Sequence, residues 1–145
     1  MYKRQGQDVR LIDLFFKGGE TVRGFDRAGY GPRDLSTGDA LGGAMYWATT
    51  AEVRFPIPFV PDDLGISGAV FADAGSLWNA GGSAENALAS CAGCLADSST
   101  IRSSVGASLM WASPVGPIRM DLAKVLSKES FDDEQMFRFG AATKF

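Results

Sequence analysis

Apolar residues alternate with small or polar residues along most of this chain, and that alternation limits the folds it can adopt. In "IRSSVGASLMWA", one set of alternate residues is mostly apolar and ends in Trp111, while the other set is small or polar. Successive side chains of a β-strand point to opposite faces of a sheet, so the pattern predicts a strand with one apolar face. The pattern recurs in "AMYWATTAEVRF", "ISGAVFADAGSLW", "GPIRMDLAKVL" and "QMFRFGAATKF". We therefore expect five strands of about ten residues, with a sixth, poorer candidate in "DVRLIDLFF".

Two architectures fit such strands. A soluble β-sandwich has one apolar face per strand and frequent turns, whereas a transmembrane β-barrel adds aromatic girdles, short turns at one end and long loops at the other. Three details favour the barrel. The polar face carries glycine, serine and charges suited to a wet lumen. The proline-rich connections "PIPFVPDDLG" and "SPVGP" are short, whereas the other connections include long ones. Large aromatic residues lie near the expected strand ends, namely Trp47, Trp78, Trp111 and Phe145.

Composition and charge argue against several classes of function. The chain has 145 residues, which suits one domain, and a net charge of −3, which provides no basic surface for nucleic acid. It contains no histidine, so the commonest general base and metal ligand is missing. No glycine-rich phosphate loop, nucleophile elbow or carboxylate dyad is present. We expect no enzyme activity, no cofactor and no metal site.

Neither a transmembrane helix nor a signal peptide is visible in the sequence. No run of 18 apolar residues exists, so no transmembrane helix is expected. The first residues, "MYKRQGQDVRL", hold no apolar signal-peptide core. For a complete chain this would favour a cytosolic protein.

Cys91 and Cys94, in "CAGC", are the only cysteines. They could form a redox pair, half of a metal site or a small disulfide. A zinc site needs about four ligands, and a thioredoxin-type pair needs a βαβ context. A surface-loop disulfide in an oxidising compartment fits best, and closing so small a loop contributes at most about 2 kcal/mol.

The motifs taken in order carry a family resemblance. "GGETVRGF" is followed by a strand with Glu52, then by "FADAGSLW", "IRSSVGASLMWASPVGPIRMDLA" and a terminal strand that ends in Phe145. From about Leu11 onward this series resembles the C-terminal part of the BamA-like outer-membrane β-barrel assembly factors, in the bacterial surface antigen superfamily. The resemblance implies a 16-stranded barrel preceded by POTRA domains. We expect residues 1–145 to be its all-β, antiparallel C-terminal part, with the POTRA domains and first strands outside this chain.

The resemblance also implies a function. It predicts assembly and insertion of β-barrel proteins into the outer membrane of a Gram-negative bacterium, without cofactor or nucleotide. The implied partners are unfolded outer-membrane proteins, the lipoproteins of an assembly complex and outer-membrane lipid. The alternatives are a TamA-like or two-partner secretion translocation pore, a passive porin, or a soluble β-sandwich binding module.

The segment "GGETVRGFDRAGYG", residues 18–31, holds the functional loop motif of Val22, Arg23, Gly24 and Phe25. Its glycines disfavour both helix and strand, so it is expected to be a loop. The family folds this loop into the barrel, which makes Arg23 an anchor and Glu52 and Asp73 its partners on the wall. An arginine suits this role because its rigid fork of donors fits carboxylates, and both acids fall on the polar face of neighbouring strands. The alternative is that Arg23 is a solvated loop residue.

The ending "FRFGAATKF" resembles the C-terminal sorting signal of outer-membrane barrels through Phe137, Phe139 and Phe145. The plainer interpretation is an amphipathic edge strand. The resemblance further predicts that residues 135–145 form one side of a seam that opens laterally. Gly140 would weaken pairing there and permit a kink.

Overall fold

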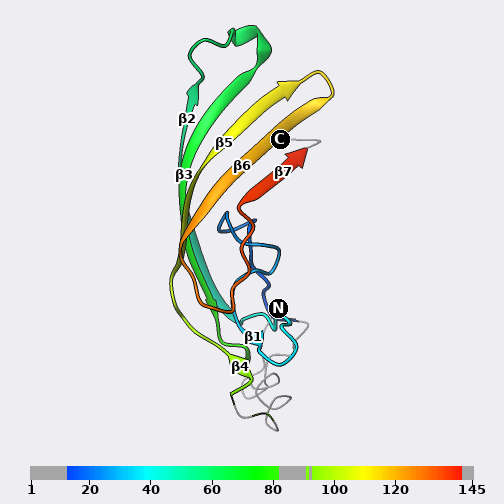
Figure 1. Cartoon of the computed structure of the whole chain (residues 1–145), viewed down its shortest axis with the longest axis vertical. Coiled ribbons are helices and arrows are strands. Elements are labelled where there is room, and N and C mark those ends of the chain that lie inside the picture. The colour runs from blue at the N-terminus through cyan, green and yellow to red at the C-terminus, as the bar shows by residue number, and fades with distance from the viewer. Residues whose placement is uncertain (1–12, 82–90, 92, 142–145) are drawn as a thin grey trace.

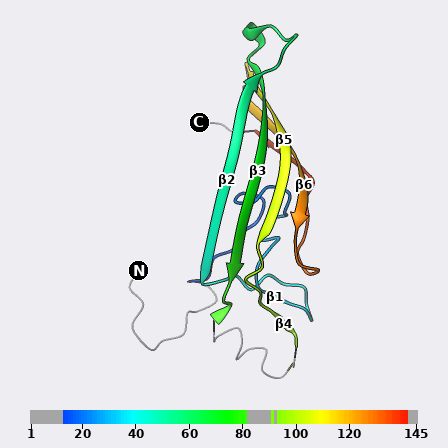
Figure 2. The same ribbon diagram turned by 90° about the vertical axis from the view of Figure 1, so that its left-hand side faces the viewer.

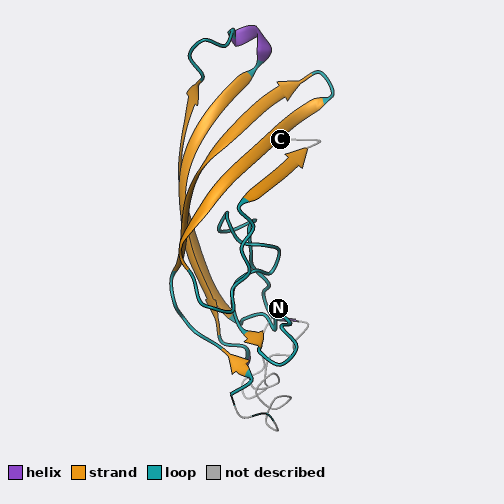
Figure 3. Ribbon diagram, viewed as in Figure 1, coloured by secondary structure: helices purple, strands orange, loops and turns teal. Residues whose placement is uncertain are grey.

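The computed structural model describes residues 13–81, 91 and 93–141, and its main feature is one curved antiparallel sheet (Figure 1, Figure 3). The strand order β2-β3-β5-β6-β7 follows the chain, so the sheet is a meander. The strands are β2 (Met45–Pro56), β3 (Ile66–Trp78), β5 (Arg102–Ser113), β6 (Gly116–Ser127) and β7 (Phe137–Ala141). The predicted all-β antiparallel meander is confirmed.

Three small elements lie outside the main sheet. The short strands β1 (Arg33–Asp34) and β4 (Leu95–Ala96) pair with each other outside the main sheet. A 3-10 turn, η2 (Asp62–Leu64), lies in the connection between β2 and β3. Within the described residues, no helix is long and apolar enough to cross a membrane.

The two faces of the sheet differ as the alternation predicts. Asp73 of β3 lies opposite Thr50 on one side and Ser104 on the other, so all three share the polar face. The other face keeps its large apolar side chains exposed, among them Trp47, Val53, Phe55, Val70, Val105, Trp111, Leu122, Phe137 and Phe139. Such a continuous exposed apolar surface is typical of a sheet that faces lipid or a partner.

The connections divide between the two ends of the sheet (Figure 2). The β5–β6 turn spans only residues 114–115, and the β2–β3 connection lies at the same end. The loop before β2, the described parts of the β3–β5 connection and the β6–β7 connection lie at the opposite end. The shortest connection between strands of the sheet, residues 114–115, and the longest, residues 79–101, thus lie at opposite ends, as in an outer-membrane barrel.

Residues 18–31, which we call the Arg23 loop, fold back against the inner, polar face of the sheet (Figure 1). A buried apolar cluster of Val22, Phe25, Tyr30 and Leu77 joins this loop to β3, and Val125 of β6 packs against it. The described part of the chain thus has its apolar core between loop and sheet.

One strand prediction needs correction, and a second is covered only in part by the described residues. The terminal strand begins at Phe137, not at Gln135, because residues 133–135 bond to the Arg23 loop instead of to β6; residues 142–145 lie outside the described chain. The sixth candidate, residues 8–16, lies mostly outside the described residues. Its last four residues form no strand, and Phe15 makes only an isolated bridge with Gly43.

Candidate functional site: an arginine loop on the inner face of the sheet

Arg23 binds Asp73 through three hydrogen bonds. Its Nε and Nη2 atoms lie 2.7 and 2.8 Å from the two carboxylate oxygens, and its backbone N–H donates to the same carboxylate at 3.0 Å. A planar guanidinium and a carboxylate match each other in this two-pronged geometry, which is stronger and more directional than a single contact. The side chain of Asp73 is almost fully buried, at 1% exposure. Asp73 therefore fixes both the position and the orientation of Arg23.

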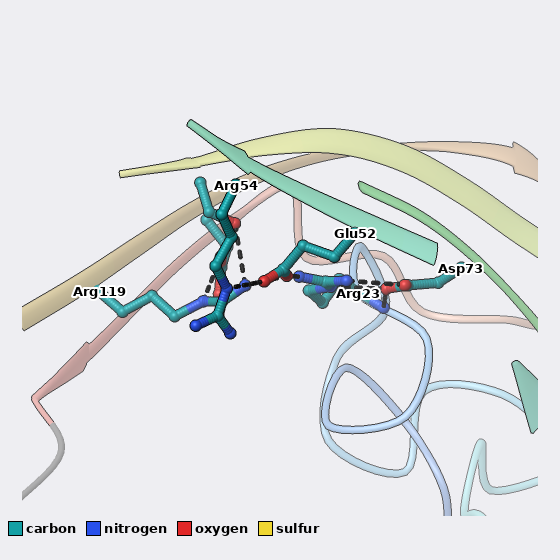
Figure 4. Close-up of polar contacts among 7 residues, drawn as sticks. Arg23, Glu52, Arg54, Asp73 and Arg119 are labelled. Carbon is teal, nitrogen blue, oxygen red and sulfur yellow. Dashed lines mark hydrogen bonds and ion pairs between the residues drawn. The ribbon is translucent and has the colours of Figure 1, made fainter. Parts of the chain in front are cut away.

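The remaining nitrogen of the guanidinium reaches a second strand. Nη1 of Arg23 lies 2.6 Å from Oε2 of Glu52 on β2 (Figure 4). The flat face of the guanidinium stacks on Phe71, with 3.5 Å between Cζ and the ring centroid. Cation–π contact of this kind adds attraction once water is displaced. Arg23 of the loop thus joins β2 to β3, because its guanidinium binds one acid on each strand.

Glu52 is shared with two further arginines that the sequence analysis did not assign to the site. Nε of Arg54 lies 2.7 Å from Oε1, and Nη2 of Arg119 lies 2.8 Å from Oε2. Arg119 also bonds Asp121 on its own strand, through Nε at 2.8 Å. The alternation of side chains along each strand could have found these residues, because it places Arg54 on the same face as Glu52 and Arg119 on the same face as Asp121. The network runs from the loop across the sheet to β6, which is the strand next to β7.

Electrostatic balance explains why Arg23 stays charged here. Burial alone would lower the pKa of Arg23, but its hydrogen bonds to Asp73 and Glu52 outweigh that effect and raise the pKa. Arg23 therefore keeps its charge and can hold the loop through ion pairs with Asp73 and Glu52.

Gly24 and Phe25 set the shape of the loop tip. Gly24 has φ +99°, a backbone conformation that disfavours any side chain. A Cβ at this position would also lie 3.1 Å from Val125 and 3.2 Å from Ala123. Phe25 packs edge to face on Tyr30, with ring centroids 5.3 Å apart. Glycine thus lets the tip lie directly on β6 while Phe25 enters the apolar cluster.

A second arginine site lies beside the first, and the sequence analysis missed it. Nε of Arg102, at the start of β5, lies 2.9 Å from Oδ2 of Asp132 in the β6–β7 connection, and both side chains are fully buried. Nη1 of Arg102 also donates to the carbonyl oxygens of Ser98 and Thr100, at 2.9 and 3.0 Å. Parity could have placed Arg102 on the polar face, but no local signal distinguishes Asp132 within "FDDE".

The other predicted residues that the structure describes form none of the ion pairs of this network. Cys91 and Cys94 form a disulfide, with Cα atoms 5.5 Å apart. Phe137 and Phe139 are exposed on the outer face of β7, and Phe145 lies outside the described residues. Gly140 pairs with Arg119, where an added Cβ would meet only a carbonyl oxygen at 4.0 Å. Space therefore does not require glycine at this position.

The described site holds a loop in place and has no groups arranged for covalent chemistry. Its carboxylates are each bonded to an arginine, and no group of three or more potential metal-ligating side chains occurs in the described part of the chain. What the geometry can do is keep a loop folded on the inner face of a sheet and connect that loop with several strands.

A curved meander that is apolar outside and polar inside, with a loop fixed on its inner face, is part of a β-barrel wall. The chain belongs to the Omp85 superfamily, whose domain matches residues 2–145.

Relatives in the superfamily share the sequence over nearly the whole chain. The outer membrane protein assembly factor BamA of Neorickettsia risticii (strain Illinois) is 39% identical over 140 residues, covering 97% of this chain and 18% of that protein. BamA of Neisseria meningitidis is 27% identical over 96% of this chain and 19% of that protein. The human sorting and assembly machinery component 50 homolog is 39% identical over 48% of this chain and 15% of that protein. This chain thus spans about a fifth of the length of the BamA relatives.

The fold comparison agrees. The crystal structure of BamA from Haemophilus ducreyi, lacking POTRA domains 1–3, matches with a TM-score of 0.71 and 26% identity, over 89% of this chain and 26% of that one.

Proposed function

We propose that this chain is the C-terminal part of an outer-membrane β-barrel that assembles and inserts other β-barrel proteins. The observation that carries the proposal is the 39% identity with a BamA over 97% of the chain. The frog and human relatives are named as sorting and assembly machinery components, which favours assembly over a translocation pore. POTRA domains and the first strands of the barrel would precede this chain in the full-length protein.

The site supports a physical role for the loop motif of Val22, Arg23, Gly24 and Phe25. Arg23 anchors the loop to the wall through Glu52 and Asp73, and the loop occupies the inner face of the strands that lead to β7. A loop held this way keeps that part of the barrel in one shape while the first and last strands of the barrel separate. No bond of the client is broken in such a process, so no catalytic residue and no cofactor are assigned.

The terminal strand supplies the template. Within the described residues, β7 pairs with five residues of β6, and its other edge has no partner. An unpaired strand edge offers backbone donors and acceptors to an extended client strand. We assign Phe137, Phe139, Gly140 and Phe145 to this seam and to a sorting signal. Unfolded outer-membrane proteins are the clients, with assembly lipoproteins and lipid as further partners and Cys91–Cys94 as a disulfide that forms after export.

The test is reconstitution of the full-length protein in lipid vesicles. A urea-unfolded small β-barrel is added, and its folding is followed by protease protection and by heat-dependent gel mobility. The proposal predicts much faster folding than in empty vesicles, and slower folding with Arg23→Ala. Arg54→Gln is the matched control, because Arg54 contacts Glu52 but does not hold the loop. Solute flux without faster folding would instead indicate a passive pore.

A further inference from the structure

The short segment before β7 bonds to the Arg23 loop through its backbone. The N–H of Gln135 donates to the carbonyl oxygen of Gly24 at 2.8 Å, and the N–H of Asp26 donates to that of Asp133 at 3.0 Å. The N–H of Asp133 donates to the carbonyl oxygen of Gly29 at 2.8 Å. These bonds flank a β-bridge between Phe25 and Glu134. The tip of the loop is thus a strand partner of residues 133–135.

The loop lies on the edge of this segment that points away from β6, which we call the outer edge. In an extended chain the N–H and C=O of alternate residues point to opposite edges. Met136 faces β6, because its carbonyl oxygen accepts from the N–H of Ala123 at 2.8 Å. Asp133 and Gln135 therefore face the other edge, where the loop bonds them. Residues 137, 139 and 141 of β7 present their backbone groups to this same outer edge.

Two ion pairs, one of them fully buried, hold the segment so that the loop can act on it. Asp132 is tied to Arg102 inside the protein, and its Oδ2 also accepts from the N–H of Glu129 at 2.8 Å. Next to it, Asp133 accepts from Nη1 of Arg33 at 2.6 Å. The approach to β7 is therefore fixed from the sheet side as well as from the loop side.

We propose that the backbone of Gly24 and Asp26 caps the outer edge just before β7 and so sets the first position at which another strand can pair there. The partner is an extended β-strand, since only backbone donors and acceptors are offered on this edge. The inference rests on the proposed function, because it assumes that strands add to β7. A strand that pairs past Phe137 towards Gln135 must displace the loop, which Arg23 anchors to Asp73.

Hydrogen exchange of the full-length protein in lipid nanodiscs tests the cap without any client. The amides of Asp26 and Gln135 are expected to exchange slowly in the wild-type protein. Arg23→Gln should make both exchange about tenfold faster or more, because it lowers the free energy of local opening. The amide of Ala123, which bonds to Met136, should not change, and Arg54→Gln should leave all three amides as they are. Fast exchange of Asp26 and Gln135 in the wild-type protein would overturn the cap.

Photo-crosslinking tests its effect on a partner strand. The probe is a synthetic peptide with the sequence of residues 136–145, and a photoreactive amino acid replaces Gln135 or Phe139 of the protein. The peptide should crosslink at position 139, and at position 135 only after Arg23→Gln. Equal crosslinking at both positions in the wild-type background, or no increase at position 135 with Arg23→Gln, would overturn the proposal. Crosslinking at neither position would contradict strand addition at β7 and therefore the proposed function. Fast amide exchange in the wild-type protein would instead contradict the cap.

Discussion

Arg23 and Arg102 lie on the same face of one sheet, and each binds an aspartate, yet they form two different kinds of contact. Arg102 and Asp132 are sealed from water, with 0% exposure of both side chains. Arg23 keeps 13% exposure and shares Glu52 with two other arginines. A sealed pair has no substitute partner when it breaks, whereas water and the neighbouring arginines soften the loss in an open network. The difference indicates a fixed attachment at Arg102 and a releasable one at Arg23.

Arg102→Met in the full-length protein is the strongest test of this difference between the two arginine contacts. The change leaves Asp132 buried without its partner, and we expect a loss of about 3–5 kcal/mol in the free energy of unfolding. Urea unfolding in detergent micelles measures it, and Arg102→Met with Asp132→Leu should recover much of the loss. A loss below about 1 kcal/mol for the single change would show that the pair is hydrated.

Arg23→Ala should destabilise the protein less, by about 1–3 kcal/mol. Glu52 keeps Arg54 and Arg119, and the backbone N–H of residue 23 can still donate to Asp73. The Arg23 side chain is 13% exposed, so its removal also opens the buried Asp73 carboxylate to water. Its main effect should be local. We expect limited proteolysis to cut residues 18–31 several times faster, with the strands unaffected. An intact and fully protected loop in this variant would mean that the apolar cluster, and not Arg23, holds it.

Gly24→Ala tests the attachment of the loop without changing any charge. The φ of +99° and the close approach to Val125 and Ala123 predict a loss of about 1–2 kcal/mol and displacement of the tip. The same proteolysis assay should show faster cutting than in the wild-type protein. A variant as stable and as protected as the wild type would mean that the tip does not lie on β6.

Arg54→Gln should have the smallest effect. The Arg54 side chain is 66% exposed, and exposed ion pairs contribute little, so the change in unfolding free energy should stay within about 0.5 kcal/mol. Urea unfolding beside Arg23→Ala gives the comparison. A loss as large as that of Arg23→Ala would show that the three arginines hold Glu52 equally.

Much of the wall could be predicted from the sequence, because alternation directly encodes which face a residue occupies. The strands containing Glu52 and Asp73 and their polar faces follow from parity alone. The bond from Arg23 to both acids needed the family resemblance, since no local pattern links a loop to strands about 30 and 50 residues away.

The other contacts of the site depend on tertiary packing, which no periodic pattern in the sequence encodes. Alternation along its strand places Phe71 on the polar face with Asp73, but no pattern links it to Arg23, because stacking depends on where the loop lies. Asp132 looks like one acid of a solvated loop, and only the fold places it beside Arg102. The late start of β7 has the same origin, since residues 133–135 bond to the loop before they can join the sheet.

The central claim is that this sheet is a barrel wall with lipid outside and the Arg23 loop inside. Nitroxide labels on β3 of the full-length protein in lipid bilayers test it most directly, at Val70 and Ala72 on the outer face and at Ala69 on the inner face. The described chain has no free cysteine to compete for the label. We predict that labels at Val70 and Ala72 collide with lipid-soluble oxygen far more than with a water-soluble nickel reagent, and that the label at Ala69 shows little access to oxygen. Preferential collision with the nickel reagent at Val70 and Ala72 would contradict a lipid-facing wall.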